Sequence, residues 1–253
     1  MAREETRNWY YRARGRAIRE LLNRYVCPEV ARPRILDVGC GTGGTTVLLG
    51  ECGEVTGVEP SELAIQLCRQ SYPQLQVIQG SVQDLAALVP SGSFDLATVL
   101  GVLCHRDVPD PLHGLQAVGR CLKAGGWLVW GDCVYPCLAR EHDEFVGAQR
   151  RFYPRQMHRL LAEAGFRVVS SAPMLGWAFP VALGLAAVYR LRRRFGRTGQ
   201  SVADRQSTDD RPLPGPLNAA LEAITYWEWR LSLSGLRMPL GVSRLILARK
   251  EMT

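Results

Sequence analysis

Short strand-like segments alternate with amphipathic segments along most of the chain. The strand-like segments lie at 35–38, 54–58, 75–78, 94–100, 127–130, 166–170 and 242–248. Short apolar runs are typical of strands buried on both faces, and helices between them are typical of a parallel sheet covered on both sides. The pattern therefore predicts an α/β fold with a Rossmann-like, doubly wound and mostly parallel sheet of seven strands.

Two stretches stand apart from this alternation. Residues 3–26 precede the first strand and carry apolar residues at helical spacing, which predicts a helix. The other stretch separates the last two strands. It contains an apolar helix at 177–191, an Arg cluster, a Gly- and Pro-rich loop at 196–216, and a helix with Leu217, Leu221, Ile224, Trp227 and Leu231 along one side. The predicted units are an N-terminal helix or lid (1–30), a core (31–171), an inserted helical cap (172–240) and the final strand of the core (241–253).

Composition and charge narrow the classes of partner. Of the 253 residues, 47% are hydrophobic and 22% are charged, as in folded globular proteins. The formal net charge is +7, but residues 35–185 carry −4, so the positive charge lies in the flanks. A basic face across the main domain, typical of nucleic-acid binding, is therefore not expected. An anionic acceptor, a membrane surface and a solvated Arg face remain open.

The amino terminus and the cysteines indicate where the protein is located and whether it binds a metal. The amino terminus lacks the apolar region of a secretory signal, so a cytoplasmic location is expected. The eight cysteines form no CxxC pair and are expected to be reduced and mostly buried. Cys133 and Cys137 are four residues apart, but no nearby histidine completes a zinc pattern. We therefore predict no metal site.

A glycine-rich turn follows the first strand and matches two known patterns. Gly39, Gly41 and Gly44 satisfy the dinucleotide pattern GxGxxG, and Asp37 with Gly39, Gly41 and Gly43 satisfies DxGxGxG. In both patterns the glycines let backbone N–H groups approach a ligand where the strand becomes a helix. A pyrophosphate at that helix end disfavours an adjacent carboxylate, whereas a ligand with an ammonium group is favoured by one. Asp37 therefore favours the second pattern.

A second carboxylate, Glu59, ends the second strand, 22 residues after Asp37. A carboxylate in that position can accept hydrogen bonds from both hydroxyls of a ribose. The alternative is a solvated glutamate at a strand end. Taken together, the two carboxylates indicate a ligand that is a nucleoside with an amino-acid tail.

Four blocks of the sequence resemble the class I S-adenosylmethionine (SAM)-dependent methyltransferases. The blocks are Ile35–Gly43, Val58–Ser61, Ser93–Leu96 and Leu122–Gly126, in the order and spacing of that family. The resemblance implies SAM as the cofactor and methyl transfer as the reaction. The cofactor contacts that it implies are Asp37, Gly39, Cys40 and Gly41 at the methionine portion, Glu59 and Pro60 at the ribose, Ser81 and Val82 at the adenine, and Leu100 and Gly101 beneath the sulfonium. Many relatives have Asp in place of Ser81, and Asp84 is the alternative for that contact.

The acceptor site is less defined. Alignment supplies most of the catalysis of an in-line methyl transfer, and a base contributes about 10²–10⁴-fold where the acceptor holds its proton tightly. His142, just beyond the fifth strand, is the first candidate for that base, and His105, after the fourth strand, is the second. The alternatives for both are capping and packing.

A looser resemblance, to a bacterial subgroup with a long C-terminal cap, rests on Trp9–Arg14, His142-Asp143 and Arg150–Tyr153. Candidate substrate-binding residues are Tyr11, Arg150, Arg151, Tyr153 and Trp177. The two adjacent arginines could clamp a phosphate or carboxylate, or form a salt bridge to the acidic block at 141–144.

The first helix of the cap carries more apolar residues than a solvated insertion needs. Burial against the core is the default expectation for these side chains, and an apolar acceptor pocket or a membrane are the alternatives. The Arg190–Arg194 cluster that follows suits an interfacial contact or a lipid phosphate.

These observations predict a SAM-dependent methyltransferase that acts on a small, partly apolar natural-product, lipid or glycoconjugate acceptor. Oxygen is favoured as the accepting atom, with nitrogen and carbon as alternatives. An anionic or lipid-like acceptor and a peripheral membrane contact stay open, as does the oligomeric state. The competing hypotheses are a SAM-binding protein of the same fold that does not transfer methyl, such as a cyclase or partner module, and an RNA methyltransferase, which the acidic core disfavours.

Overall fold

A single seven-stranded sheet organises the molecule. The computed structural model describes residues 8–195, 213–236 and 238–252. Its strands are β1 (Arg34–Val38), β2 (Glu54–Glu59), β3 (Gln76–Gln79), β4 (Phe94–Leu100), β5 (Leu122–Cys133), β6 (Phe166–Met174) and β7 (Ser243–Lys250). They lie in the order β3-β2-β1-β4-β5-β7-β6; β1 to β5 run parallel, and β7 is antiparallel to both of its neighbours. The predicted fold class is confirmed.

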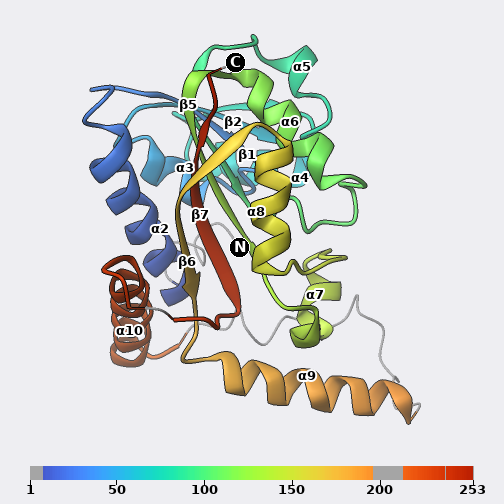
Figure 1. Ribbon diagram of the computed structural model, residues 1–253. Coiled ribbons are helices and arrows are strands. Elements are labelled where there is room, and N and C mark those ends of the chain that lie inside the picture. The colour runs from blue at the N-terminus through green and yellow to red at the C-terminus, as the bar shows by residue number, and fades with distance from the viewer. Residues whose placement is uncertain (1–7, 196–212, 237, 253) are drawn as a thin grey trace.

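Helices cover both faces of this sheet (Figure 1). They are α2 (Trp9–Leu21) with its π-helical extension η1 (Leu22–Val26), α3 (Gly44–Leu49), α4 (Glu62–Ser71), α5 (Leu85–Leu88), α6 (Pro111–Cys121), the 3-10 turn η2 (Pro136–Leu138), α7 (Glu141–Phe145), α8 (Pro154–Glu163), α9 (Phe179–Arg194) and α10 (Gly215–Leu233). Residues 3–7 of the predicted first helix and 196–212 of the predicted loop lie outside the described residues.

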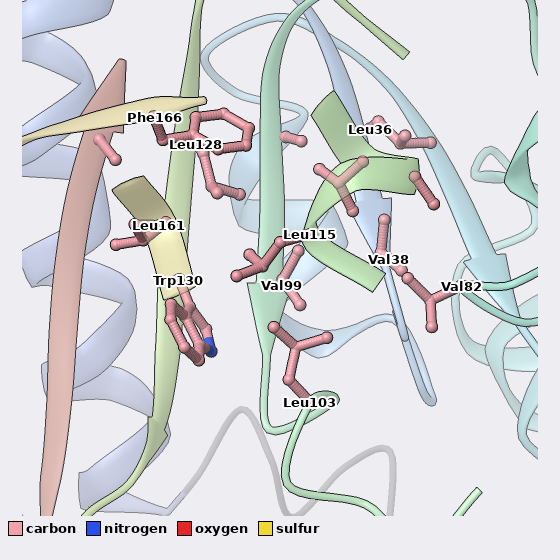
Figure 2. Close-up of a cluster of buried hydrophobic side chains, with 14 of the residues drawn as sticks. Leu36, Val38, Val82, Val99, Leu103, Leu115, Leu128, Trp130, Leu161 and Phe166 are labelled. Atoms are coloured by element: carbon pink, nitrogen blue, oxygen red, sulfur yellow. The ribbon is translucent and has the colours of Figure 1, made fainter. Parts of the chain in front are cut away.

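The larger apolar core lies between the sheet and helices α5, α6 and α8. Figure 2 shows Trp130 and Leu128 of β5 and Val99 of β4 facing Leu115 of α6 and Leu161 of α8. A second core lies on the opposite face, where α2, η1 and α10 cover β1, β4, β5 and β7. With both faces covered, the parallel strands can be continuously apolar, and functional side chains gather at their carboxyl ends.

The orientation of α10 differs from the sequence pattern. Leu217, Ile224, Trp227 and Leu231 are each about half exposed, and the buried side of the helix instead includes Glu222. Glu222 pairs with Arg12 at 2.7 Å and with Arg16 at 3.3 Å, both on α2. Tyr226 and Trp229 lie on the same side of α10 as Glu222 and belong to the second core. Aromatic packing and these ion pairs together therefore fix the orientation of the helix.

Most of α9 also departs from the expectation of core burial. Val181, Leu185, Val188 and Leu191 are exposed, and the buried residues of the helix are alanines. Within the described ranges, no helix combines the length and hydropathy needed to span a bilayer. The division of the chain into lid, core, cap and final strand stays a prediction.

Candidate functional site

The glycine turn after β1 adopts a backbone conformation that favours glycine. Gly39, Gly41 and Gly43 have φ angles of 72°, 55° and 87°, in the left-handed region. A Cβ atom on Gly39 would lie 2.3 Å from Cγ2 of Val102, so a larger side chain would also clash there. The turn leads directly into α3, whose N-terminus faces the same end of the sheet. This arrangement can bring backbone N–H groups close to a ligand.

Asp37 is buried beneath this turn, and both of its carboxylate oxygens are held. Oδ1 accepts a hydrogen bond from Oγ1 of Thr98 at 2.6 Å, and Oδ2 accepts one from Oγ1 of Thr46 at 2.7 Å. Burial raises the pKa of Asp37, against the lowering effect of the two hydroxyls and of Arg14. A carboxylate in this position favours a cationic group beside it. The sequence did not reveal the two supporting threonines.

Glu59 holds the glycine turn from behind. Its Oε2 accepts a hydrogen bond from the backbone N–H of Gly41 at 2.9 Å, and its Oε1 accepts one from the N–H of Ser61 at 3.0 Å. The side chain therefore joins the turn after β1 to the start of α4. A carboxylate has about four lone-pair positions, so Glu59 retains capacity for further donors such as ribose hydroxyls.

A cavity of about 260 Å³ opens at the carboxyl ends of β1, β4 and β5. Asp37 lies on one side, Leu100 and Gly101 end β4 beside it, and Gly131 and Asp132 end β5. The remaining walls come from the start of α2, from α7, and from β6 and β7: Tyr10, Tyr11, Arg14, His142, Val146, Met174, Ser243, Arg244 and Leu245. Charged and polar side chains from several walls, among them Asp37, Arg14 and Arg244, thus share the cavity with apolar ones, as in sites for small organic ligands.

Asp132 is a buried carboxylate in this cavity that the sequence analysis missed. Its Oδ2 accepts a hydrogen bond from Nε1 of Trp130 at 2.8 Å, whereas its Oδ1 has no hydrogen-bond partner among the described residues. Burial raises the pKa of Asp132 to about 6. The signal was available: Asp132 follows an apolar strand, as Asp37 and Glu59 do. A buried acid with a raised pKa in a cavity is typical of functional sites.

The wall from α2 is aromatic and basic. The guanidinium of Arg14 lies 5.0 Å from the ring centre of Tyr11 and 5.6 Å from that of Tyr10, and its Nη2 donates to Oγ1 of Thr45 at 3.2 Å. Arg14 thus places a positive charge near the glycine turn.

The thiols of the cavity are poor nucleophiles. Burial raises the pKa of Cys133 to about 11, and it also raises the pKa values of Cys40 and Cys104.

The cavity brings together several of the predicted site residues. It is lined by Asp37, Gly39, Cys40, Gly41, Leu100, Gly101, His142 and Tyr11. Glu59 and Pro60 lie behind the turn, at the end of β2. Ser81 and Asp84 form a separate turn, in which Oδ2 of Asp84 accepts from the N–H and hydroxyl of Ser81 at 2.9 and 2.6 Å. These bonds lower the pKa of Asp84, and the neighbouring Val82 belongs to the main core.

His105 does not line the cavity. Its Nδ1 accepts a hydrogen bond from the N–H of Asp107 at 3.3 Å, and its ring lies against Gly147, where an added Cβ would come within 2.2 Å of Nε2. These contacts suit the packing role that the sequence left as an alternative.

Four predicted substrate-binding residues also lie outside this cavity: Arg150, Arg151, Tyr153 and Trp177. Arg151 is buried in a two-bond ion pair with Asp143, at 2.8 and 2.7 Å, so its guanidinium is already occupied. Nη1 of Arg150 donates to the carbonyl of Pro109 at 3.4 Å. Tyr153 is exposed. The indole N–H of Trp177 donates to Oγ1 of Thr225 on α10 at 3.1 Å. Among the described residues, no group of His, Cys, Asp and Glu is arranged to hold a metal ion.

Comparison with known proteins connects this geometry to a family. Residues 35–126 match the family model of a methyltransferase domain. A ubiquinone biosynthesis O-methyltransferase of Albidiferax ferrireducens is 37% identical over 110 residues, which cover 41% of this chain and 42% of that protein. A demethylmenaquinone methyltransferase of Bacillus licheniformis is 34% identical over 125 residues, 47% of this chain and 49% of that protein. The matched stretches thus span less than half of these relatives.

A likeness in structure extends over most of the chain. A SAM-dependent methyltransferase from Mesorhizobium loti superposes with a TM-score of 0.61 at 18% identity, covering 94% of this chain and 98% of that one. At this identity the likeness establishes the fold alone. The matched domain contains Asp37 and the glycine turn, which line one side of the cavity, and Glu59, which holds that turn from behind. Residues 35–126 are therefore a methyltransferase domain, and the chain as a whole has the fold of SAM-dependent methyltransferases.

Proposed function

We propose that this chain is a SAM-dependent methyltransferase acting on a small, partly apolar acceptor, with a hydroxyl oxygen as the accepting atom. The observation that carries the proposal is the buried Asp37 beneath the glycine turn, at the edge of a cavity that also contains apolar side chains. An anionic group in that position suits a cationic cofactor, and the apolar walls suit an organic acceptor.

The described residues fit the cofactor. Asp37 would face the ammonium group of the amino-acid tail, Arg14 its carboxylate, and Glu59 the ribose hydroxyls. Gly39, Cys40 and Gly41 would contact the tail through their backbone. Pro60, Ser81, Val82 and Asp84 are proposed for the nucleoside portion, and Leu100 and Gly101 for the sulfonium. When bound, SAM supplies an electrophilic methyl group.

The acceptor side of the cavity has two candidates for holding a proton. His142, on α7, and Asp132, at the end of β5, both line it. A phenolic hydroxyl has a pKa of about 10 and therefore keeps its proton at neutral pH, so a base is useful for such an acceptor. The similarity to a ubiquinone biosynthesis O-methyltransferase supports an aromatic hydroxyl in particular.

Binding of the cofactor is expected to depend on pH through Asp37. Because burial raises the pKa of Asp37 in the free protein, its carboxyl takes up a proton at a higher pH than an ordinary aspartate does. A cationic ligand favours the ionised form, so affinity should rise as pH rises through that pKa and then level off. Calorimetric titration with S-adenosylhomocysteine from acidic to neutral pH measures this dependence. The Asp37→Asn variant should bind S-adenosylhomocysteine more weakly, and its affinity should change less with pH. The same dependence of affinity on pH in this variant as in the wild type would contradict the role of Asp37.

The proposed reaction is tested with the purified chain, methyl-labelled SAM and a panel of acceptors. The panel contains a hydroquinone with a short prenyl tail, the same ring without the tail, a primary amine and an RNA transcript. We expect label on the prenylated hydroquinone first, and a loss of at least about tenfold on removal of the tail. Tight cofactor binding without transfer to any acceptor would favour a non-methylating role, and label on RNA alone would favour an RNA methyltransferase.

A further inference from the structure

One side of α9 is fixed to the body of the protein. Ala182 and Ala186 are buried, and the ring of Phe179 meets Tyr135 edge to face with 5.6 Å between ring centres. Tyr135 lies just after β5, next to η2. The helix is therefore anchored along its first two turns to the segment that follows the fifth strand.

Polar contacts extend this anchor toward the end of the helix. The hydroxyl of Tyr189 and Nη1 of Arg193 both donate to Oε1 of Glu144 on α7. Nη1 of Arg190 donates to the carbonyl of Cys137 at 2.8 Å. These groups project from the same side as the buried alanines, so the rotation of α9 about its axis is well defined.

The opposite side of α9 is apolar and exposed. Its residues recur at intervals of three and four positions and fall within an arc of about 120°. They are Val181, Leu185, Val188, Leu191 and Phe195, between 47% and 70% exposed. We call this set the outer face of α9. In Figure 1 the helix runs along the outside of the molecule. At 1.5 Å per residue, the outer face extends for about 21 Å, from residue 181 to residue 195.

Two arginines, Arg192 and Arg194, lie at the carboxyl end of α9, the first of them within the outer face. Unlike Arg190 and Arg193, the exposed side chains of Arg192 and Arg194 make no ion pair or hydrogen bond with any described residue. An apolar helix face with uncompensated arginines at one end is typical of helices that lie in the headgroup region of a bilayer.

We propose that the outer face of α9 docks on the surface of a bilayer that contains anionic phospholipids. The apolar side chains enter the boundary between headgroups and acyl chains, and Arg192 and Arg194 contact the lipid phosphates. This proposal does not depend on methyl transfer. It would give an apolar acceptor a short route to the cavity, because α7 lines the cavity with His142 and holds α9 through Glu144.

Flotation of the purified chain with lipid vesicles tests this surface. The vesicles contain either phosphatidylcholine alone or equal parts of phosphatidylcholine and phosphatidylglycerol. We expect the wild type to float with the anionic vesicles and to bind neutral ones at least about tenfold more weakly. Leu185→Glu combined with Val188→Glu should abolish flotation, and Arg192→Glu combined with Arg194→Glu should remove the preference for anionic lipid.

Matched substitutions elsewhere on the surface serve as controls. Leu63→Glu on α4, where Leu63 is 66% exposed, and Arg155→Glu on α8 should leave flotation unchanged. Every variant is checked for wild-type thermal unfolding and S-adenosylhomocysteine binding. The proposal is overturned if the wild type does not float, if the outer-face variant floats normally, or if the wild type is a dimer that this variant converts to a monomer without any vesicle binding.

Discussion

Replacing Glu59 with glutamine should weaken binding of S-adenosylhomocysteine by about 100-fold. In the free protein its two oxygens accept hydrogen bonds from the N–H groups of Gly41 and Ser61. Glutamine has one acceptor oxygen and one NH₂ group, so one of these backbone donors would face another donor. The side chain would also lose acceptor positions for the ribose hydroxyls. The substitution therefore disturbs both the glycine turn and the contact to the ligand.

Calorimetry on the purified variant gives the affinity directly. Glu62→Gln, three residues later in the exposed first turn of α4, is the matched control and should bind like the wild type. Glu59→Asp should bind with intermediate affinity, because its carboxylate is retained on a shorter side chain. Wild-type affinity in Glu59→Gln would show that the end of β2 does not contact the cofactor.

Asp132→Asn should reduce kcat by about 100-fold or more while increasing the stability of the fold. The loss of activity follows if Asp132 holds the proton released by the acceptor hydroxyl, because an amide cannot accept that proton. Asparagine can still accept the hydrogen bond from Nε1 of Trp130 through its carbonyl oxygen. The variant therefore preserves the local structure and removes the charge.

The gain in stability follows from the raised pKa of Asp132. A folded-state pKa of about 6, against an ordinary value of 3.8, means that the folded protein binds more protons than the unfolded chain between these pH values. The free energy of unfolding of the wild type therefore falls as pH rises from about 4 to about 6 and stays lower above that range. Replacement by asparagine should remove this loss, which amounts to about 1–3 kcal/mol at neutral pH.

Urea unfolding at pH 4 and pH 7.5 separates the two effects. The stability difference between Asp132→Asn and wild type should be small at pH 4 and appear at pH 7.5. Asp107→Asn, an exposed carboxylate on the loop after β4, should change neither stability nor kcat. If Asp132→Asn were less stable than wild type at pH 7.5, or retained full kcat, Asp132 would be a structural residue. The kcat of His142→Asn would then test whether His142 is the base.

The sequence predicts those parts of the fold that local pattern determines. β4 coincides with the predicted segment at 94–100, and α8 begins at the predicted Pro154 and ends before Gly165, which has a φ of 81°. Asp37 and the glycine turn were found because a strand, a turn and a helix follow one another within ten residues. These features are determined by residues close together in the sequence, so the local pattern is enough to predict them.

Features that depend on distant contacts were predicted less well. The buried side of α10 is the one whose Tyr226 and Trp229 pack into the second core and whose Glu222 pairs with Arg12 and Arg16, more than two hundred residues earlier. Asp132 ends an apolar strand as Asp37 does, but its burial and its place in the cavity, to which α2, α7 and β7 also contribute, depend on distant contacts. For Arg151 the sequence left open an anion clamp and a salt bridge to the acidic block at 141–144, and the structure has the salt bridge, to Asp143.

The central claim is that the cavity beside Asp37 transfers a methyl group from SAM to an apolar hydroxylated acceptor. Incubation of the chain with methyl-labelled SAM and a lipid extract of its own organism, followed by extraction into organic solvent, tests this claim most directly. We predict a labelled, organic-soluble product whose label is attached through oxygen and whose formation is lost in Glu59→Gln. Cofactor binding of normal affinity with no label in any extracted product would contradict the claim.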